Sequence, residues 1–298
     1  MLFDTSNISI DFITNDCLNK KKVTLSVVRL DKIHSIISGN KLFKLHFYLE
    51  EVIKNGKMGV LTYGGAYSNH LVATAFACKS ISVKSIAIVR GEKPAILSPT
   101  LLACINYGMQ LVFISRAAYD EKAANDHDLS IENKYPDFLI IPEGGFGSKG
   151  AEGAALIPAL LPKNITHICT PIGTATTFAG LLMGAEKNQQ IIGVPVVKGE
   201  NDIMERVFNL SGRQYPYQLL DGYHFGGYAK KTNELLAFMN DFYKKHNIPT
   251  DFVYTAKMMF AVLDKIENNF FVPGSKIACL HTGGLQGNQS LPAGTLVF

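Results

Sequence analysis

Apolar residues follow two alternating patterns along this chain, one typical of buried strands and the other of helices. Short runs rich in β-branched residues predict strands at residues 24–29, 59–63, 85–90, 110–114, 137–142, 166–171, 191–197 and 276–281. Between these runs, as in residues 42–52 and 235–242, apolar side chains recur every three or four positions, which predicts amphipathic helices. Strands and helices in alternation indicate an α/β fold with parallel sheets flanked by helices.

This pattern leaves three architectures open: one doubly wound sheet, two sheets in two domains, or a closed barrel. The glycine cluster at residues 144–153 is a candidate crossing between domains. In open parallel sheets, ligands bind where the carboxyl ends of strands meet the N-termini of helices. The loops that follow the predicted strands are therefore the places to search for function.

The composition is that of an ordinary globular chain. With 298 residues and 47% hydrophobic content, it can form one large domain or two of ordinary size. The net charge of +4 is small, so nucleic acid is not an expected partner. The five cysteines are scattered without a CxxC pair, which suits a reducing compartment. No secretory signal is visible, and the longest stretch without Asp, Glu, Lys or Arg is interrupted by Pro171 and Gly173. We expect a cytoplasmic protein with no membrane partner.

Two loops after predicted strands carry polar groups suited to ligand binding. In residues 62–70, Ser68 and Asn69 stand where N-cap residues belong, and His70 is expected in the first turn of the helix. These residues either simply cap the helix or face a ligand. In residues 170–182, Gly173 and the small or hydroxylated residues 174–177 lead into a helix whose N–H groups can bind phosphate. No Gly-Lys-Ser/Thr follows, so this loop is not a Walker motif.

Other motifs are less specific. Residues 145–150 read GFGSKG, but the acidic residue that a dinucleotide site requires about 20 positions on is absent, so we interpret them as a loop or hinge. Thr282 precedes two glycines, which either approach a flat ligand or form an ordinary turn. The eight histidines lack the spacing of a metal site, and no G-x-S-x-G occurs. We therefore expect neither a bound metal nor a hydrolase of that kind.

One cation stands out by its position. In SGNKLFKL, residues 38–45, Lys41 directly follows Gly39 and Asn40 at the start of a predicted helix. A lysine at a helix start is most often a surface residue. Lys44, three residues later, is expected to be such a surface lysine.

The order of these segments is more informative than any one of them. SGNK, GGAYSNH at 64–70, the Gly/Thr loop and HTGG at 281–284 together resemble the pyridoxal-phosphate enzymes of the tryptophan synthase β type, fold type II. Over about residues 31–284 the chain is most similar to the 1-aminocyclopropane-1-carboxylate deaminase and D-cysteine desulfhydrase family. GNKxxKL and GGxxSNH are the most specific segments. The family's PVY segment corresponds to DFVYTAKMM at 251–259, and its earlier tyrosine corresponds to Tyr228.

The resemblance implies pyridoxal 5'-phosphate as the cofactor and a two-domain fold. Residues 1–43 and 155–298 would form the large cofactor-binding domain and residues 44–154 the small α/β domain, with the cofactor between them. The partners would be a small amino-acid substrate and a second copy of the chain in a homodimer. Lys41 would hold the cofactor covalently, which requires that its ammonium pKa, roughly 10.4 when free, be lowered or bypassed.

The resemblance also implies the other roles in the site. Asn69 would hydrogen-bond the pyridoxal 3'-oxygen, and Thr282 would lie near the pyridine nitrogen. The phosphate would be bound by Gly173, Thr174, Ala175, Thr176 and Thr177, a loop poorer in glycine than is common in this fold. The catalytic residues would be Lys41, Ser68, Tyr228 and Tyr254, and the substrate would contact Ser68, Asn69, His70, Tyr228, Tyr254 and Thr255.

Two positions bear on the substrate. In the resembled family, the deaminases carry Glu after the PVY tyrosine and Leu before the last Gly-Gly, whereas desulfhydrase-like members carry Ser or Thr. This chain has Thr255 and Thr282, which favours β-elimination of D-cysteine to pyruvate, hydrosulfide and ammonia. The alternative is deamination of 1-aminocyclopropane-1-carboxylate to 2-oxobutanoate and ammonia. An alternative of another class is a non-catalytic, Rossmann-like nucleotide-binding protein that uses GFGSKG.

Overall fold

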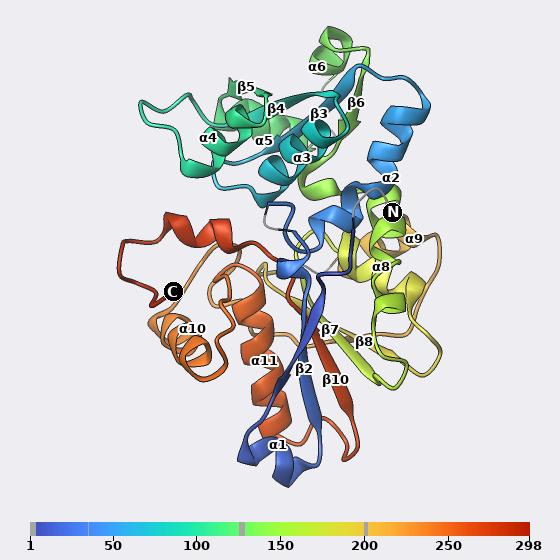
Figure 1. The fold of residues 1–298 in the computed structure, drawn as a ribbon, viewed down its shortest axis with the longest axis vertical. Helices are drawn as coiled ribbons and strands as arrows, with labels where there is room; N and C mark the ends of the chain where they lie inside the picture. Colours follow the sequence, from blue (N-terminus) through green and yellow to red (C-terminus); the bar gives the residue numbers. More distant parts are fainter. Residues whose placement is uncertain (1–3, 35, 125–128, 200–201) are drawn as a thin grey trace.

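The chain folds around two separate β-sheets, which lie in the lower and upper halves of Figure 1. The computed structural model describes residues 4–34, 36–124, 129–199 and 202–298. In the six-stranded sheet the order is β1 (Ser9–Ile13), β2 (Thr24–Arg29), β10 (Lys276–Leu280), β7 (His167–Ile172), β8 (Gln190–Pro195) and β9 (Gln218–Leu219). Strand β1 runs antiparallel to β2, and the other neighbours pair in parallel. The wholly parallel four-stranded sheet has the order β5 (Met109–Ile114), β4 (Lys84–Arg90), β3 (Gly59–Gly64) and β6 (Phe138–Ile141).

All eight predicted strands are present, and two sheets are the correct choice among the three architectures. The continuous apolar runs arise because parallel strands are covered on both faces, and every residue of β3 is buried. Strands β1 and β9 were not predicted. Strand β1 lies at an edge of its sheet and leaves Phe12 65% exposed, and β9 has two residues. Neither produces the run of buried residues on which the prediction depends.

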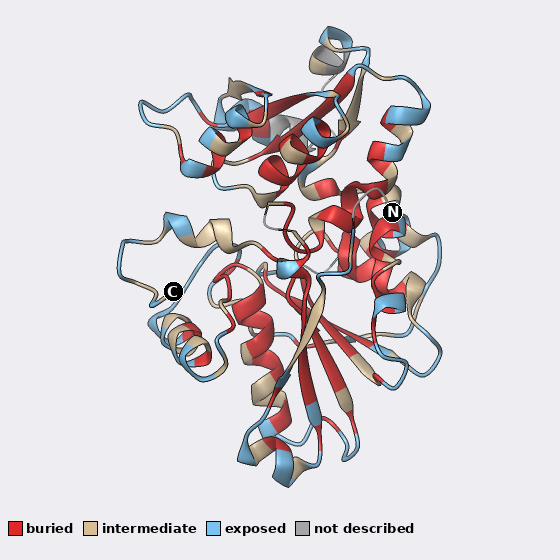
Figure 2. Cartoon of the chain, viewed as in Figure 1, coloured by how far each residue is buried: buried red, intermediate tan, exposed pale blue. Residues whose placement is uncertain are grey.

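Helices cover the sheets, and buried residues run along the strands and along α8 and α11 in Figure 2. The α-helices are α1 (Asp16–Lys21), α2 (Lys41–Lys54), α3 (Asn69–Ser80), α4 (Pro99–Asn106), α5 (Arg116–Ala124), α6 (Leu129–Lys134), α7 (Ser148–Ala154), α8 (Thr176–Gly184), α9 (Ile203–Ser211), α10 (Asn233–His246) and α11 (Thr255–Glu267). Short 3-10 helices are η1 (Leu30–Lys32), η2 (Glu143–Gly145), η3 (Pro158–Leu160) and η4 (Leu285–Ser290). No helix of the described residues is long and apolar enough to cross a membrane.

Three helices pack closely in the region between the two sheets: α2 contacts α7, and α7 contacts α8. Glycine permits this approach, because a Cβ on Gly153 would lie 1.9 Å from the carbonyl oxygen of Phe43, and one on Gly180 would lie 2.3 Å from that of Ala151. The N-termini of α2 and α8 are thereby held beside each other. The predicted domain boundaries at residues 43/44 and 154/155 stay a prediction.

Candidate active site

The start of α2 is fixed by a close contact between two loops. Gly39 has φ of +74°, and a Cβ on it would lie 2.0 Å from the carbonyl oxygen of Thr282, so only glycine fits. The backbone N–H of Asn40 donates to that same oxygen at 3.3 Å. Thr282 is itself buried. This contact explains why SGNK and HTGG occur in one chain: together they place Lys41, the first residue of α2, next to the Thr282 loop.

The Lys41 amine lies in a partly buried position that weakens its hold on its proton. Its Nζ donates to Oδ1 of Asn40 at 2.7 Å, and Nδ2 of Asn40 donates to Oγ1 of Thr177 at 2.8 Å. Burial lowers the pKa of Lys41 from 10.5 to about 8, against the opposing effect of the Asp251 carboxylate. Near pH 8 much of the amine is therefore neutral, as attack on a carbonyl carbon requires.

The loop after β7 leads into a buried helix start whose chemistry suits an anion. Ala175, with φ of +61°, stands at the N-cap of α8, where no side chain of the described residues makes a capping hydrogen bond. Ala175, Thr176 and Thr177 are buried, so the N–H groups at this helix start need another partner. Those N–H groups and the helix dipole favour a negative charge. The geometry therefore fits the phosphate-binding role expected for residues 173–177.

Lys44 brings an amine to this helix start, and the expectation that it lies on the surface is wrong. It is 3% exposed, and its Nζ donates to Oγ1 of Thr174 at 3.4 Å. Burial lowers the pKa of Lys44 well below 10.5, and the charge of Lys41 lowers it further. A buried amine beside an uncapped helix N-terminus suits a phosphate group. The spacing of three from Lys41 was the available signal, because it puts both lysines on one helix face.

The start of α3 combines a capping serine with an asparagine whose amide makes no hydrogen bond to a described residue. Ser68 is the N-cap, as expected, and its Oγ accepts from the N–H of Leu71 at 3.4 Å. Both amide atoms of Asn69 are buried and make no hydrogen bond to any described residue. An unpaired buried amide destabilises a protein, so a ligand is its natural partner. Asn69 thus fits the contact with a pyridoxal 3'-oxygen that the sequence predicts.

His70 lies in the first turn of α3, as expected, and Thr62 fixes its protonation. Oγ1 of Thr62 donates its single proton to the carbonyl of Ile141 at 2.7 Å, so at 2.7 Å it accepts from Nε2–H of His70. Nδ1 then carries a lone pair, which is buried without a hydrogen bond to a described residue. Burial, with the charges of Lys41 and Lys44, lowers the pKa of His70 well below 6.5. The ring is a neutral acceptor.

The GFGSKG segment lines this site. Gly145 packs against two site residues: a Cβ on it would lie 3.3 Å from Cβ of Lys44 and 3.7 Å from Cε1 of His70. Gly147 has φ of +126°, and a Cβ there would lie 2.4 Å from Oη of Tyr48. These glycines allow close packing of side chains. The interpretation of residues 145–150 as a loop holds only in part, because Gly145 ends η2 and Gly150 lies within α7.

Two tyrosines form a hydrogen-bonded pair beside the phosphate-type loop. Oη of Tyr254 donates to Oη of Tyr228 at 3.3 Å, and the ring centroids are 6.1 Å apart. A Cβ on Gly173 would lie 3.2 Å from Cε1 of Tyr254, so this ring packs on the loop. Burial, followed by the neighbouring Tyr228, raises the pKa of Tyr254 well above 10.0. Tyr254 keeps its proton at neutral pH, whereas Tyr228, 56% exposed, lies at the open side.

Asp251 organises the start of α11 and was missed by the sequence analysis. Its carboxylate accepts from the N–H groups of Val253, Tyr254 and Thr255 at 2.7–2.9 Å. The Thr255 hydroxyl donates to Oδ1 of Asp251 at 2.7 Å and accepts from its N–H at 2.8 Å. Thr255 is fully buried, so the structure places its hydroxyl on Asp251 and not on the open side with Tyr228. An aspartate a few residues before a predicted helix was the available signal, because Asp side chains often accept from nearby backbone N–H groups.

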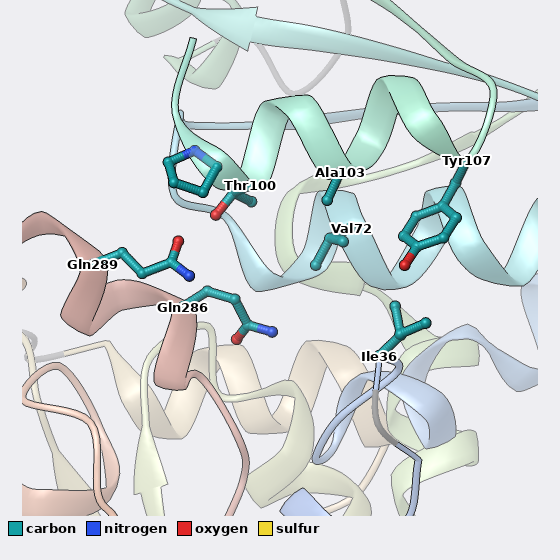
Figure 3. A pocket seen from close by; sticks show the side chains of 8 residues that line it. Ile36, Val72, Thr100, Ala103, Tyr107, Gln286 and Gln289 are labelled. Atoms are coloured by element: carbon teal, nitrogen blue, oxygen red, sulfur yellow. The ribbon is translucent and has the colours of Figure 1, made fainter. Parts of the chain in front are cut away.

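A cavity of about 180 Å³ lies between α3, α4 and η4, as Figure 3 shows. It is lined by Ile36, Val72, Pro99, Thr100, Ala103, Tyr107, Gln286 and Gln289. None of these residues is a predicted site residue, and none carries a carboxylate or an amine. The candidate site is therefore a different region, defined by the starts of α2, α3, α8 and α11.

Comparison with known proteins identifies one matching family and several relatives. The family model described as "Pyridoxal-phosphate dependent enzyme" matches residues 20–283. The "Putative 1-aminocyclopropane-1-carboxylate deaminase" of Thermotoga maritima is 29% identical over 282 residues, which cover 88% of each chain. The protein of the same name from Pyrococcus abyssi is 28% identical over 276 residues, 84% of this chain and 81% of the relative. A crystal structure described as an ACC deaminase homologue superposes with a TM-score of 0.78 at 24% identity, over 96% of this chain and 92% of that one.

Proposed function

The chain belongs to the pyridoxal-phosphate dependent enzymes, and from this premise we propose that it eliminates hydrogen sulfide from D-cysteine. It is a lyase of the 1-aminocyclopropane-1-carboxylate deaminase-like family, has the tryptophan synthase β-like fold type II, and uses pyridoxal 5'-phosphate. In the proposed reaction, D-cysteine and water give pyruvate, ammonia and hydrogen sulfide.

The observation that carries the proposal is a weakly basic amine together with a tyrosine that keeps its proton. Burial lowers the pKa of Lys41 to about 8, so a fraction of its amine is neutral near pH 7 and can accept a proton, whereas Tyr254, whose pKa is raised well above 10.0, stays protonated and can donate a hydrogen bond. β-Elimination of D-cysteine needs a base that removes the α-proton, and the sulfur leaves as hydrosulfide, an anion that a hydrogen bond from a neutral hydroxyl stabilises. Ring opening of 1-aminocyclopropane-1-carboxylate has no α-proton to remove. Of the two threonines that favour D-cysteine, only Thr282 still supports it, because the Thr255 hydroxyl donates its hydrogen bond to Asp251.

The residues of the site divide the work between binding and proton transfer. When bound, pyridoxal phosphate supplies an electron sink for the electrons left at the substrate's Cα. Lys44 and the start of α8 would hold the phosphate, and Asn69 the 3'-oxygen. Ser68, at the start of α3, would bind the substrate carboxylate. The Lys41 amine would take the α-proton, and the Tyr254 hydroxyl would donate a hydrogen bond to the departing sulfur.

The test is a substrate panel on the purified protein supplied with pyridoxal phosphate. We expect sulfide and pyruvate in equal amounts from D-cysteine, with less of both from L-cysteine. D-Serine is included to test how the rate depends on the leaving group. Production of 2-oxobutanoate from 1-aminocyclopropane-1-carboxylate, with no sulfide from D-cysteine, would establish the deaminase alternative instead.

The non-catalytic alternative is tested by colour. A Schiff base between the cofactor and lysine absorbs near roughly 410–420 nm and is fixed by borohydride onto one residue. We expect Lys41→Ala to lose both the band and the labelling. A Lys41→Ala protein that keeps the band would show that the lysine assignment is wrong.

We also propose a homodimer in a reducing compartment such as the cytoplasm. Met204 and Phe208 are exposed, lie four residues apart on α9 and so share one face, which suits a second copy. The five cysteines are free, as they would be in that compartment. Light scattering of the wild type and of a Met204→Glu variant tests the dimer, since only a dimer built on this face would dissociate.

A further inference from the structure

The segment that presents Tyr228 has an unfavourable backbone. Between β9 and α10, φ is positive at Phe225 (50°), Gly226 (94°), Gly227 (117°) and Ala229 (52°). Residues other than glycine seldom adopt such angles, so this turn will not persist unless contacts hold it. Tyr228 stands in the middle of it.

One such contact comes from a buried lysine that has no role so far. Lys257, on α11, is 0% exposed, and its Nζ donates to the carbonyl oxygen of Gly227 at 2.8 Å. The same oxygen accepts from the N–H of Lys230 at 3.1 Å. Lysine is almost never fully buried, since its charge loses its hydration. Burial lowers the pKa of Lys257 to about 8, against the opposing charge of Asp251, so at neutral pH it is largely an ammonium and a strong donor.

The position of Lys257 links the two tyrosines. It lies three residues after Tyr254, the N-cap of α11, so the first turn of the helix that follows Tyr254 also binds the carbonyl that precedes Tyr228. A second anchor is apolar: the ring of Phe225 meets that of Phe260, also on α11, with centroids 5.0 Å apart. The turn is thus attached to α11 on both sides of Gly226.

We propose that Lys257 is a positioning residue that holds the turn at residues 225–229 and thereby keeps the hydroxyl of Tyr228 on that of Tyr254. This inference rests on the proposed function for its effect on catalysis, but the attachment of the turn does not depend on any reaction. Lys257 acts through the backbone of Gly227 and does not itself contact the substrate.

The first test is limited proteolysis of Lys257→Met, which keeps the length of the side chain and removes the donor. Lys230 and Lys231 are exposed in this segment and provide trypsin sites. We expect cleavage after them, located by mass spectrometry, to accelerate by about tenfold or more, because local opening becomes easier. Lys245→Met, at an exposed lysine of α10, is the matched control and should leave the rate unchanged. An unchanged rate in Lys257→Met would overturn the proposal.

The second test is a double-mutant cycle with Tyr228→Phe. Displacement of a side chain by about 1 Å can lower a rate by about 10²-fold, so we expect Lys257→Met to lower kcat by roughly 10- to 100-fold. In the Tyr228→Phe background it should lower kcat by less than about threefold, because the hydroxyl it positions is gone. If the effects of the two substitutions on kcat simply multiply, Lys257 does not act through Tyr228 and the proposal is overturned. The cofactor band should persist in both variants.

The two tests separate this proposal from the proposed function. If no substrate of the panel reacts, the proposed function fails, while the trypsin rates still decide whether Lys257 holds the turn. If Lys257→Met does not fold, Lys257→Gln keeps a neutral donor and should give intermediate cleavage; wild-type cleavage rates in that variant would overturn the proposal.

Discussion

Replacing Lys44 by methionine should change the cofactor-free and cofactor-bound protein in opposite directions. Lys44 is 3% exposed and its pKa is well below 10.5, so the cofactor-free protein bears the cost of a desolvated amine. Methionine has a similar length and no charge. We expect the cofactor-free variant to be more stable at pH 7 by about 1–4 kcal/mol, by analogy with the range found when buried ion pairs are replaced by apolar residues.

The pH dependence of stability gives this prediction its sign. Between the lowered pKa of folded Lys44 and the unfolded value of roughly 10.4, the unfolded chain binds more protons than the folded protein. The free energy of unfolding of the cofactor-free wild type therefore rises with pH in that window, by up to about 1.4 kcal/mol per pH unit from this one residue. Lys44→Met should remove that part of the slope.

Lys44→Met should weaken cofactor binding, although it stabilises the cofactor-free protein. Loss of charge-assisted hydrogen bonds to the phosphate removes about 1.5–3 kcal/mol, so the Kd for pyridoxal phosphate should rise by roughly 10- to 150-fold. Urea unfolding from pH 6 to 9 measures the first effect and a visible absorbance titration the second. Lys54→Met, at an exposed lysine of the same helix, is the control. A less stable cofactor-free variant, or unchanged cofactor affinity, would refute an anion site at Lys44.

Three further predictions follow from the other site residues. In the cofactor-free protein, the rate at which Lys41 reacts with added pyridoxal phosphate should rise with pH and level off above about 8, as its amine loses its proton; a midpoint near 10, seen by absorbance, would contradict the burial argument. Asp251→Ala should lower the free energy of unfolding in urea by about 3–5 kcal/mol, because three N–H groups and a hydroxyl lose their acceptor; a loss under 1 kcal/mol would show that water replaces it. Asn69→Leu should leave the cofactor-free protein as stable or stabilise it by about 1 kcal/mol while weakening cofactor binding about tenfold, and a destabilised variant with normal affinity would assign the amide a structural role instead.

Much of the fold was predictable because its signals are local. A parallel strand covered on both faces must be apolar throughout, so β3 and the other central strands could be read directly. Helix starts are marked by short-range capping, so Ser68 and His70 fall where expected. Gly39 indicated that α2 begins close by. The glycine is required because the carbonyl oxygen of Thr282, more than 200 residues away in the sequence, leaves no room for a Cβ.

The sequence by itself therefore determined eight strands, the starts of α2, α3 and α8, and the order of segments that points to Lys41. Only the tertiary structure decided that Lys44 is buried, that the Thr255 hydroxyl belongs to Asp251, and that Lys257 reaches the turn before Tyr228. The physical reason is that a lysine has the same local pattern on a surface and in a core. Its environment is set by partners such as Thr174, 130 positions along the chain, and that environment fixes whether it carries a solvated charge or an amine that acts on a ligand.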